Sequence, residues 1–169
     1  MKPQRMLAPL ALLAVLGVVA AAAGNAASPA RVGTATVGPY TTPHAGVVVD
    51  AGITGTAHLV TLPTGQAFIR VSAEGLAPGG TYAAHVHFGA CTDYLGHFRY
   101  DPAGLPTRSN EIWLDLDANA AGYASDEVVV PAFDLTQTLS LVVHQHSNTD
   151  VGVGPPGPRT ACGDVVLAH

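Results

Sequence analysis

Lysine is almost absent from this 169-residue chain, which carries one lysine, six arginines and twelve carboxylates. The lysine and one arginine lie at the extreme N-terminus, as Lys2 and Arg5. The remainder therefore has five arginines against twelve carboxylates, a formal charge of −7 with neutral histidines. A chain this acidic repels a phosphate backbone, which excludes nucleic acid as a partner. The preference for arginine, with abundant Ala, Gly and Pro, is typical of a GC-rich bacterial genome.

Long apolar runs are missing except at the N-terminus, where Lys2 and Arg5 precede the apolar stretch 6–23 and a run of small residues. This order is typical of a secretory signal peptide, with cleavage after Ala23. An uncleaved membrane anchor is the alternative, because the stretch is almost long enough to span a bilayer. The small residues that follow favour cleavage, and we expect a secreted or extracytoplasmic protein (periplasm or cell envelope).

Cysteine is scarce as well, with only Cys91 and Cys162 in the chain. Export takes a protein to an oxidising compartment where a disulfide persists, so we expect these two residues to be partners. The mature chain has the usual length of one domain. We expect a signal peptide at 1–23, an N-terminal leader at 24–45 that is either flexible or supplies a strand, and one β-barrel domain at 46–169.

Helical periodicity and internal repeats are also missing, and short apolar segments alternate with Gly, Pro and Asn turns. This pattern predicts an all-β fold, a Greek-key antiparallel sandwich or barrel of about eight strands. The predicted strands are 31–37, 46–50, 54–62, 66–73, 81–88, 111–117, 123–130, 139–146 and 161–168. Two stretches, 89–110 and 147–160, are too long for simple hairpins, and we expect function to reside in these loops.

The stretch "YAAHVHFGAC", residues 82–91, places two histidines in an apolar strand. Successive strand residues point to opposite faces, so His85 and His87 share one face while Tyr82, Ala84 and Val86 share the other. If the apolar face is in the core, the histidines look outward. They are then either a metal site on the outer wall or two solvated side chains.

A second histidine pair occurs in "LSLVVHQHS", where His144 and His146 share a face with Val142. His97 follows Cys91 by six residues, inside the first long loop. A bond from Cys91 to Cys162 would pin that loop to the last strand and hold His97 near both histidine strands. His146 either approaches a metal held by the others or lies at a frayed strand end.

Four motifs in order now resemble the copper/zinc superoxide dismutase family. These are "AAHVHFGAC", "CTDYLGHF", "LSLVVHQHS" and "GPRTACGDV", and the resemblance extends from Thr54 to the C-terminus. It implies a Cys91–Cys162 disulfide, a superoxide substrate and Arg159 above the open copper position, with His97 also taking part in proton transfer. The copper ligands it implies are His85, His87, His97 and His144. Imidazole nitrogen without thiolate suits a copper that changes oxidation state.

The departures from the family concern its zinc site. No histidine lies between His97 and His144, position 109 is serine, and Asp101 is the only carboxylate in the stretch 98–110. A zinc site of the usual nitrogen and oxygen ligands cannot be assembled there. The chain thus resembles the copper-only branch of the family, and we expect copper without zinc. Glu111, just past this stretch, is the predicted orienting group for the second nitrogen of His97.

The sequence leaves three functions to compare. The first is a secreted, copper-dependent superoxide dismutase. The second is a non-catalytic copper-binding or copper-delivery protein, which would keep the histidines without needing Arg159. The third is a metal-free structural β-sandwich, disfavoured by four matched ligands. A membrane partner is expected only if the signal segment is uncleaved, and a monomer is favoured. His44, His58, His169, Phe88 and Trp113 are expected to be ordinary surface or packing residues.

Overall fold

A computed structural model describes residues 29–40, 44–48, 52–145 and 157–168. Within these ranges the chain forms β-strands and no helix, which confirms the all-β prediction. The strands are β1 (Arg31–Pro39), β2 (Thr54–Thr61), β3 (Gln66–Glu74), β4 (Thr81–Phe88), β5 (Trp113–Asp117), β6 (Ala124–Pro131), β7 (Leu139–His144), β8 (Arg159–Asp164) and β9 (Val166–Leu167). In the same ranges, no helix has the length and apolar character needed to cross a membrane.

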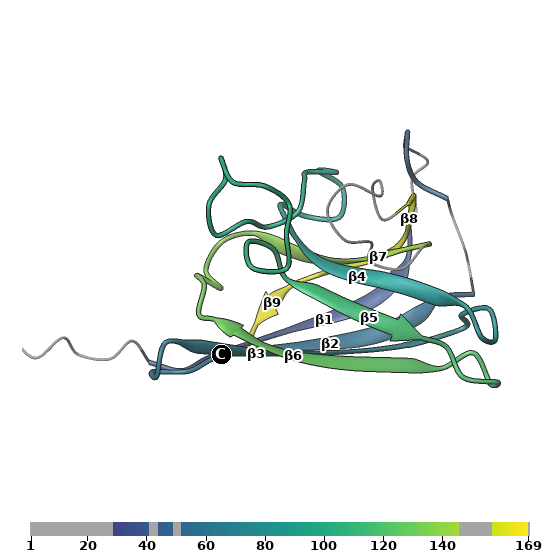
Figure 1. Ribbon diagram of the computed structural model, residues 1–169, viewed down its shortest axis with the longest axis horizontal. Helices are drawn as coiled ribbons and strands as arrows, with labels where there is room; N and C mark the ends of the chain where they lie inside the picture. The colour runs from purple at the N-terminus through teal and green to yellow at the C-terminus, as the bar shows by residue number, and fades with distance from the viewer. Residues whose placement is uncertain (1–28, 41–43, 49–51, 146–156, 169) are drawn as a thin grey trace, which may run out of the picture.

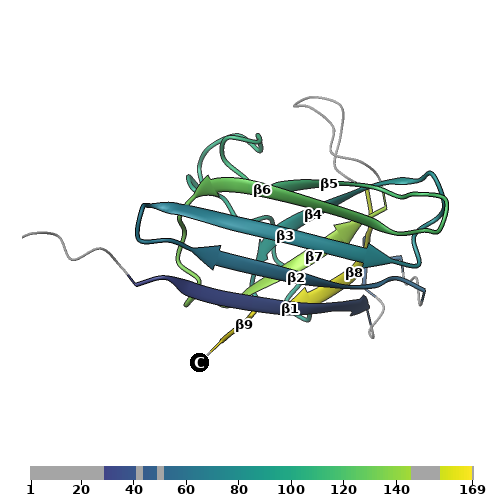
Figure 2. The same cartoon turned by 90° about the horizontal axis from the view of Figure 1, so that it is seen from below.

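The strands form one antiparallel sheet that curls into a nearly closed barrel. Their order is β5-β4-β7-β8-β1-β2-β3-β6, and β9 pairs with β1. Figures 1 and 2 show two layers, one of β1, β2, β3 and β6 and the other of β4, β5, β7 and β8. The edge strands β5 and β6 meet where the amide of Asp115 donates to Asp126 Oδ2 at 2.7 Å. The core lies between the layers.

The layer of β1, β2, β3 and β6 has one dry face and one wet face, as its alternating sequence predicts. In β2 and β3 the inward Leu59, Ile69 and Val71 are completely buried. Their outward neighbours His58 and Arg70 are exposed. This layer supplies one side of the core and presents an ordinary polar surface to water.

The strands β4 and β7 differ because they are buried on both faces. The inward side chains of β4 and β7, such as Val86 and Leu141, join the core. The outward His85 and Val142 are also buried, at 1% exposure each. The loop between β4 and β5, residues 89–112, lies over this outer face (Figure 1). The outward side chains of β4 and β7 are therefore buried beneath this loop.

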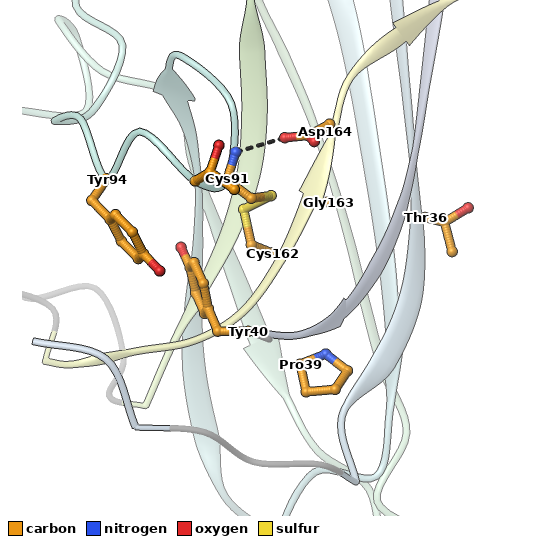
Figure 3. Close-up of a pocket in the computed structure, with 9 residues that line it drawn as sticks. Thr36, Pro39, Tyr40, Cys91, Tyr94, Cys162, Gly163 and Asp164 are labelled. Atoms are coloured by element: carbon orange, nitrogen blue, oxygen red, sulfur yellow. Dashed lines mark hydrogen bonds between the residues drawn. A yellow bond between two sulfur atoms is a disulfide. The ribbon is translucent and has the colours of Figure 1, made fainter. Parts of the chain in front are cut away.

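The predicted disulfide between Cys91 and Cys162 is present and ties this loop to β8, with the two Cα atoms 5.9 Å apart. The amide of Cys91 also donates to Asp164 Oδ1 at 2.6 Å, as Figure 3 shows. Next to this link Tyr40, the residue that follows β1, stacks on Tyr94 of the loop with ring centroids 5.6 Å apart. Three contacts thus hold the start of the loop to the barrel wall.

The predicted strand 46–50 is wrong in its described part. Residues 46–48 make only an isolated parallel bridge, from Val47 to Arg159. The reason is that β1 already pairs with β8 through Gly38 and Pro39, which leaves only the first two residues of β8, Arg159 and Thr160, free at that edge. Residues 49 and 50 lie outside the described ranges.

The segment expected as a leader, 24–45, contains β1, which pairs with β2 along most of its length and with β8 at its end. Its part from Arg31 to Pro39 is therefore a strand of the barrel, and the barrel begins before residue 46. Alternating burial of Ala35 and Val37 explains why this segment is a strand. The predicted signal peptide, 1–23, lies outside the described residues.

Candidate metal centre

Four histidines converge on the outer face of β4 and β7. One ring nitrogen from each lies within 4.8 Å of those of the others. The four are His85, His87, His97 and His144, the set that the sequence predicts. Three of them are less than 5% exposed, and His97 is half-buried. No other cluster of three or more potential metal ligands occurs in the described parts of the chain.

Strand register places three of the four side chains. Alternation in β4 puts His85 and His87 on the outer face, and β7 pairs antiparallel with β4 so that His144 lies opposite Ala83. The register of β7 with β8 shifts between Val143 and His144, which brings Arg159 opposite His144. The shift is a β-bulge, a device common beside functional sites.

The fourth histidine arrives on the loop. The segment 96–98 runs antiparallel to the end of β4, since the amide of Phe88 donates to Gly96 O at 3.1 Å and that of Phe98 to Val86 O at 2.8 Å. Phe98 itself is buried in the core. His97 therefore lies directly across from His87, in an isolated antiparallel bridge.

Two backbone carbonyls determine which nitrogens of His87 and His144 face the centre. A carbonyl oxygen only accepts hydrogen bonds, so its imidazole partner must donate. His87 Nδ1 donates to Leu95 O at 2.9 Å, and His144 Nδ1 donates to Gly157 O at 3.0 Å. The two Nε2 atoms, 3.3 Å apart, are then left with lone pairs directed at one another. That arrangement suits a shared cation between them.

A carboxylate orients His97 in the same way. His97 Nδ1 donates to Glu111 Oε2 at 2.7 Å, and His97 Nε2 lies 3.0 Å from His85 Nδ1. The centre therefore offers one Nδ1, from His85, and three Nε2 atoms. Four neutral imidazole nitrogens without thiolate or thioether are a donor set that fits copper in both oxidation states.

Burial keeps two of the imidazoles, those of His87 and His144, neutral. It lowers the pKa of His87, and the neighbouring His97 and His144 lower it further, while the Leu95 carbonyl partly offsets these effects. Burial likewise lowers the pKa of His144 to about 4, although its bond to Gly157 O opposes the shift. The lone pairs of both residues are thus available at neutral pH.

Glu111 is buried where an unpaired carboxylate would be unstable, and it accepts hydrogen bonds from three donors. It is 1% exposed. Besides His97, it accepts from Trp113 Nε1 at 2.8 Å and from Arg99 Nε at 2.9 Å. Burial raises the pKa of Glu111, but the bonds from His97, Trp113 and Arg99 outweigh that effect and lower it to about 2. The carboxylate is ionised at neutral pH and acts only as an acceptor.

Arg159 lies beside the histidines at the first position of β8. Its Nη2 donates to Leu95 O at 2.6 Å, so one carbonyl orients both the arginine and His87. The side chain is partly exposed. A fixed cation thus lies at the edge of the centre, within reach of solvent, although it is no ligand itself because guanidinium has no lone pair to donate.

The structure thus brings together the predicted ligands, Arg159 and Glu111. His58 is exposed on β2, and His44 stacks on Tyr94 with ring centroids 3.8 Å apart, so neither joins the cluster. His146 and His169 lie outside the described residues. Asp101, the only carboxylate of the stretch 98–110, accepts from the amide of Ala103 at 3.0 Å.

Two residues of the centre were not predicted. Arg99 was not singled out, and Trp113 was expected to be a packing residue. A signal existed in the i, i+2 spacing of an extended chain, which puts Arg99 on the face of His97 and Trp113 on the face of Glu111. The isolated bridge between Arg99 and Glu111 then joins the two pairs.

Comparison with known proteins connects this arrangement to a fold. No protein-family model matches the chain, and no curated protein matches it. Among solved structures, the clock protein EA4 is similar with a TM-score of 0.57 and 18% identity, over 79% of this chain and 92% of that one. A SOD-like protein from Bacillus subtilis has a TM-score of 0.55 and 14% identity, over 79% and 97% of the two chains. A mutant of Candida albicans superoxide dismutase 5 has a TM-score of 0.51 and 17% identity, over 84% and 94%.

These likenesses show the fold, which is that of superoxide dismutase-like proteins. The resemblance to the copper/zinc superoxide dismutase family that the motifs indicate is confirmed in the barrel and in the grouping of the four histidines. The identities are too low to transfer an activity.

Proposed function

We propose that this chain, a superoxide dismutase-like barrel with a four-histidine centre, is a copper-dependent superoxide dismutase that acts outside the cytoplasm. The observation that carries the proposal is the placement of Arg159 beside the ligand cluster, on the carbonyl that also orients His87. A metal-binding role alone needs the histidines. An enzyme for a small anion also needs a cation beside them, and this chain has one.

Copper held by His85, His87, His97 and His144 would supply one-electron redox chemistry, oxidising one superoxide to oxygen and reducing a second to peroxide. The chain's own residues would do the rest. Arg159 attracts the anion and orients it with forked donors. Peroxide leaves as hydrogen peroxide and needs two protons. His97 would take up one of them from solvent on Nε2, the nitrogen that faces the centre, and pass it on, while its Nδ1–H stays on Glu111.

The metal content is proposed to be one copper per chain and no tightly held zinc. The four-histidine set supports copper. The lack of histidine from 98 to 143, and the engagement of Asp101 by the backbone of its own loop, support the absence of zinc. Elemental analysis after reconstitution and brief chelation should return copper alone. Zinc equal to copper after chelation would contradict this part of the proposal.

Export is proposed on two supports, the charged-apolar-small order of residues 1–23 and the Cys91–Cys162 disulfide. Mass spectrometry of protein from a bacterial periplasm should give a chain beginning at Gly24. Full-length protein in the membrane fraction would indicate an uncleaved anchor instead.

Arg159→Ala is the decisive test of enzyme against copper carrier. Guanidinium contributes no ligand, so copper content should stay at the parent level. Superoxide turnover should fall about 10-fold or more, the result of losing at least ~1.4 kcal/mol of steering and orientation. The remaining rate should depend less on ionic strength than the parent rate, because a steering charge has been removed. Pulse radiolysis at several salt concentrations measures both effects.

Arg70→Ala is the matched control, since Arg70 is an exposed arginine on the opposite layer of the barrel. It removes the same charge and should leave turnover close to the parent value. If Arg159→Ala also turned over superoxide at the parent rate with full copper, the arginine would be a surface charge. The non-catalytic copper-binding or copper-delivery function would then be favoured.

A further inference from the structure

Two side chains that are not candidate metal ligands, Arg99 and Trp113, each donate a hydrogen bond to the Glu111 carboxylate, one to each oxygen. Its Oε1 accepts from Arg99 Nε at 2.9 Å, and its Oε2 accepts from Trp113 Nε1 at 2.8 Å. The third donor is His97 Nδ1, at 2.7 Å on the same Oε2. The carboxylate thus has little freedom to rotate, and the nitrogen of His97 that it meets is fixed.

Arg99 and Trp113 are themselves held in place by further contacts. Arg99 is paired with Glu111 across an antiparallel bridge, and its Nη1 donates to Gly104 O at 3.3 Å. Trp113 is 8% exposed at the start of β5, and its ring lies 5.8 Å from that of His85 between centroids. Arg108 covers the indole with its guanidinium carbon 5.3 Å from the ring centroid. Neither residue can leave Glu111 without moving its own surroundings.

We propose that Arg99 and Trp113 are positioning residues that lock Glu111 against His97 Nδ1 and so keep the Nε2 lone pair of His97 directed at the metal centre. The inference rests on the proposed metal-binding function but makes a claim about the protein without metal. A carboxylate only accepts hydrogen bonds, so a locked Glu111 requires the proton of neutral His97 to be on Nδ1. Without the hydrogen bonds from Arg99 and Trp113, the carboxylate could rotate away and let His97 form the tautomer with the proton on Nε2.

The test begins with the metal-free protein at pH 8, where ¹⁵N NMR of the imidazole nitrogens reports the tautomer of His97. The parent should show the proton on Nδ1 alone. Trp113→Phe removes the N–H while keeping an aromatic ring against His85, and Arg99→Met removes the guanidinium while keeping the aliphatic stem. Each variant should show a measurable fraction of the Nε2–H tautomer. Arg70→Met, which loses an exposed arginine on the opposite layer of the barrel, should match the parent.

Copper affinity supplies the second readout, measured by competition with a chelator. Loss of a residue that supports a metal ligand typically weakens binding by about 10- to 100-fold. We expect Arg99→Met to weaken copper binding by close to 10-fold and Trp113→Phe to weaken it several-fold. Each variant removes one of the two hydrogen bonds that these residues donate to Glu111. Arg99→Lys should recover part of the loss, because it restores the charge without the forked geometry.

A background lacking the carboxylate makes the mechanism falsifiable even if one variant folds poorly. In Glu111→Gln protein, Arg99→Met or Trp113→Phe should cost almost nothing further in copper affinity, because residues that act through one partner are not additive. Full additivity, or an unchanged His97 tautomer in both single variants, would overturn the proposal. Neither measurement involves superoxide, so an inactive parent would refute the proposed enzyme and leave this test intact.

Discussion

The two layers of the barrel use outward-facing histidines in opposite ways. On β2, His58 faces solvent and stays a surface residue. On β4, His85 and His87 occupy the same kind of position, yet each is 1% exposed and both belong to the four-histidine cluster. The difference comes from the covering loop and not from strand geometry, which is equivalent in the two layers. An outward histidine joins the four-histidine cluster here because a disulfide-tethered loop closes over it and brings His97.

Removing a candidate ligand should give the largest difference between a histidine variant of one layer and that of the other. His87→Ala deletes one of the four donor nitrogens, so copper affinity should fall by more than the roughly 10- to 100-fold that losing a supporting residue costs. Superoxide turnover should fall with it. Copper content after dialysis against a chelator, measured by elemental analysis, checks the expectation.

His58→Ala is the matched variant on the other layer and should change neither copper content nor turnover. If it lowered copper content as much as His87→Ala does, the outward face of β2 would take part in metal binding. The contrast drawn between the layers would then be wrong.

Untethering the loop should have the next largest effect. Replacing both cysteines with serine opens the link between Cys91 and Cys162, which are 71 residues apart in sequence. The chain-entropy model gives a loss of about 4 kcal/mol in the free energy of unfolding for a closed loop of this length. Urea denaturation measures that loss, and copper affinity should drop alongside it because the loop carries His97.

Parent protein treated with a reductant should behave like the double-serine variant, which itself should not respond to the reductant. Unchanged copper affinity in the double-serine variant would mean that the loop closes over β4 without its tether. The disulfide would then stabilise the barrel without organising the centre.

Lowering the pH should have a smaller effect, on the free energy of unfolding of the protein without metal. The pKa of His144 is about 4 in the folded protein, below the ordinary value of 6.5 that applies after unfolding. Between these values the unfolded chain binds the proton and the folded one does not, so stability present above pH 6.5 is lost as the pH falls towards 4. The loss from this residue is on the order of 3 kcal/mol. Urea midpoints in a chelator across this pH range measure it.

His144→Gln cannot take up a proton and should flatten that part of the pH dependence. The variant keeps a polar side chain of similar size at the same place on β7. An equally steep loss of stability in the variant would show that other groups govern the acid response.

The fold was predictable because most strands carry a clear alternation. In β2 and β3 the buried Leu59 and Ile69 have exposed neighbours, which is the pattern expected of a sheet with one wet face. The segment 46–50 looked equally strand-like, but a strand also needs a free edge. That edge depends on β1 and β8 meeting, a long-range fact that local sequence does not contain.

The four-histidine cluster was predictable from ordered motifs, whereas the residues that support it were not. His85 and His87 alone left a metal site and solvated side chains open, with solvated side chains slightly favoured, because alternation reveals the face of a strand and not what covers it. Arg99 and Trp113 were missed for a related reason. Their role depends on the burial of Glu111, and a carboxylate in a sequence gives no sign of its depth.

The register shift between β7 and β8 has a consequence for insertions and deletions. Ala161 faces the core opposite Val143, so strict alternation would turn Arg159 inward as well. Thr160 is the extra residue that reverses the parity and lets Arg159 face outward opposite His144. The spacing between the cysteine and the arginine of "RTAC" is therefore not free to vary by one residue. Any attempt to graft this centre onto another antiparallel barrel must carry the irregularity across with the side chains, or the cation will be delivered to the wrong side of the wall.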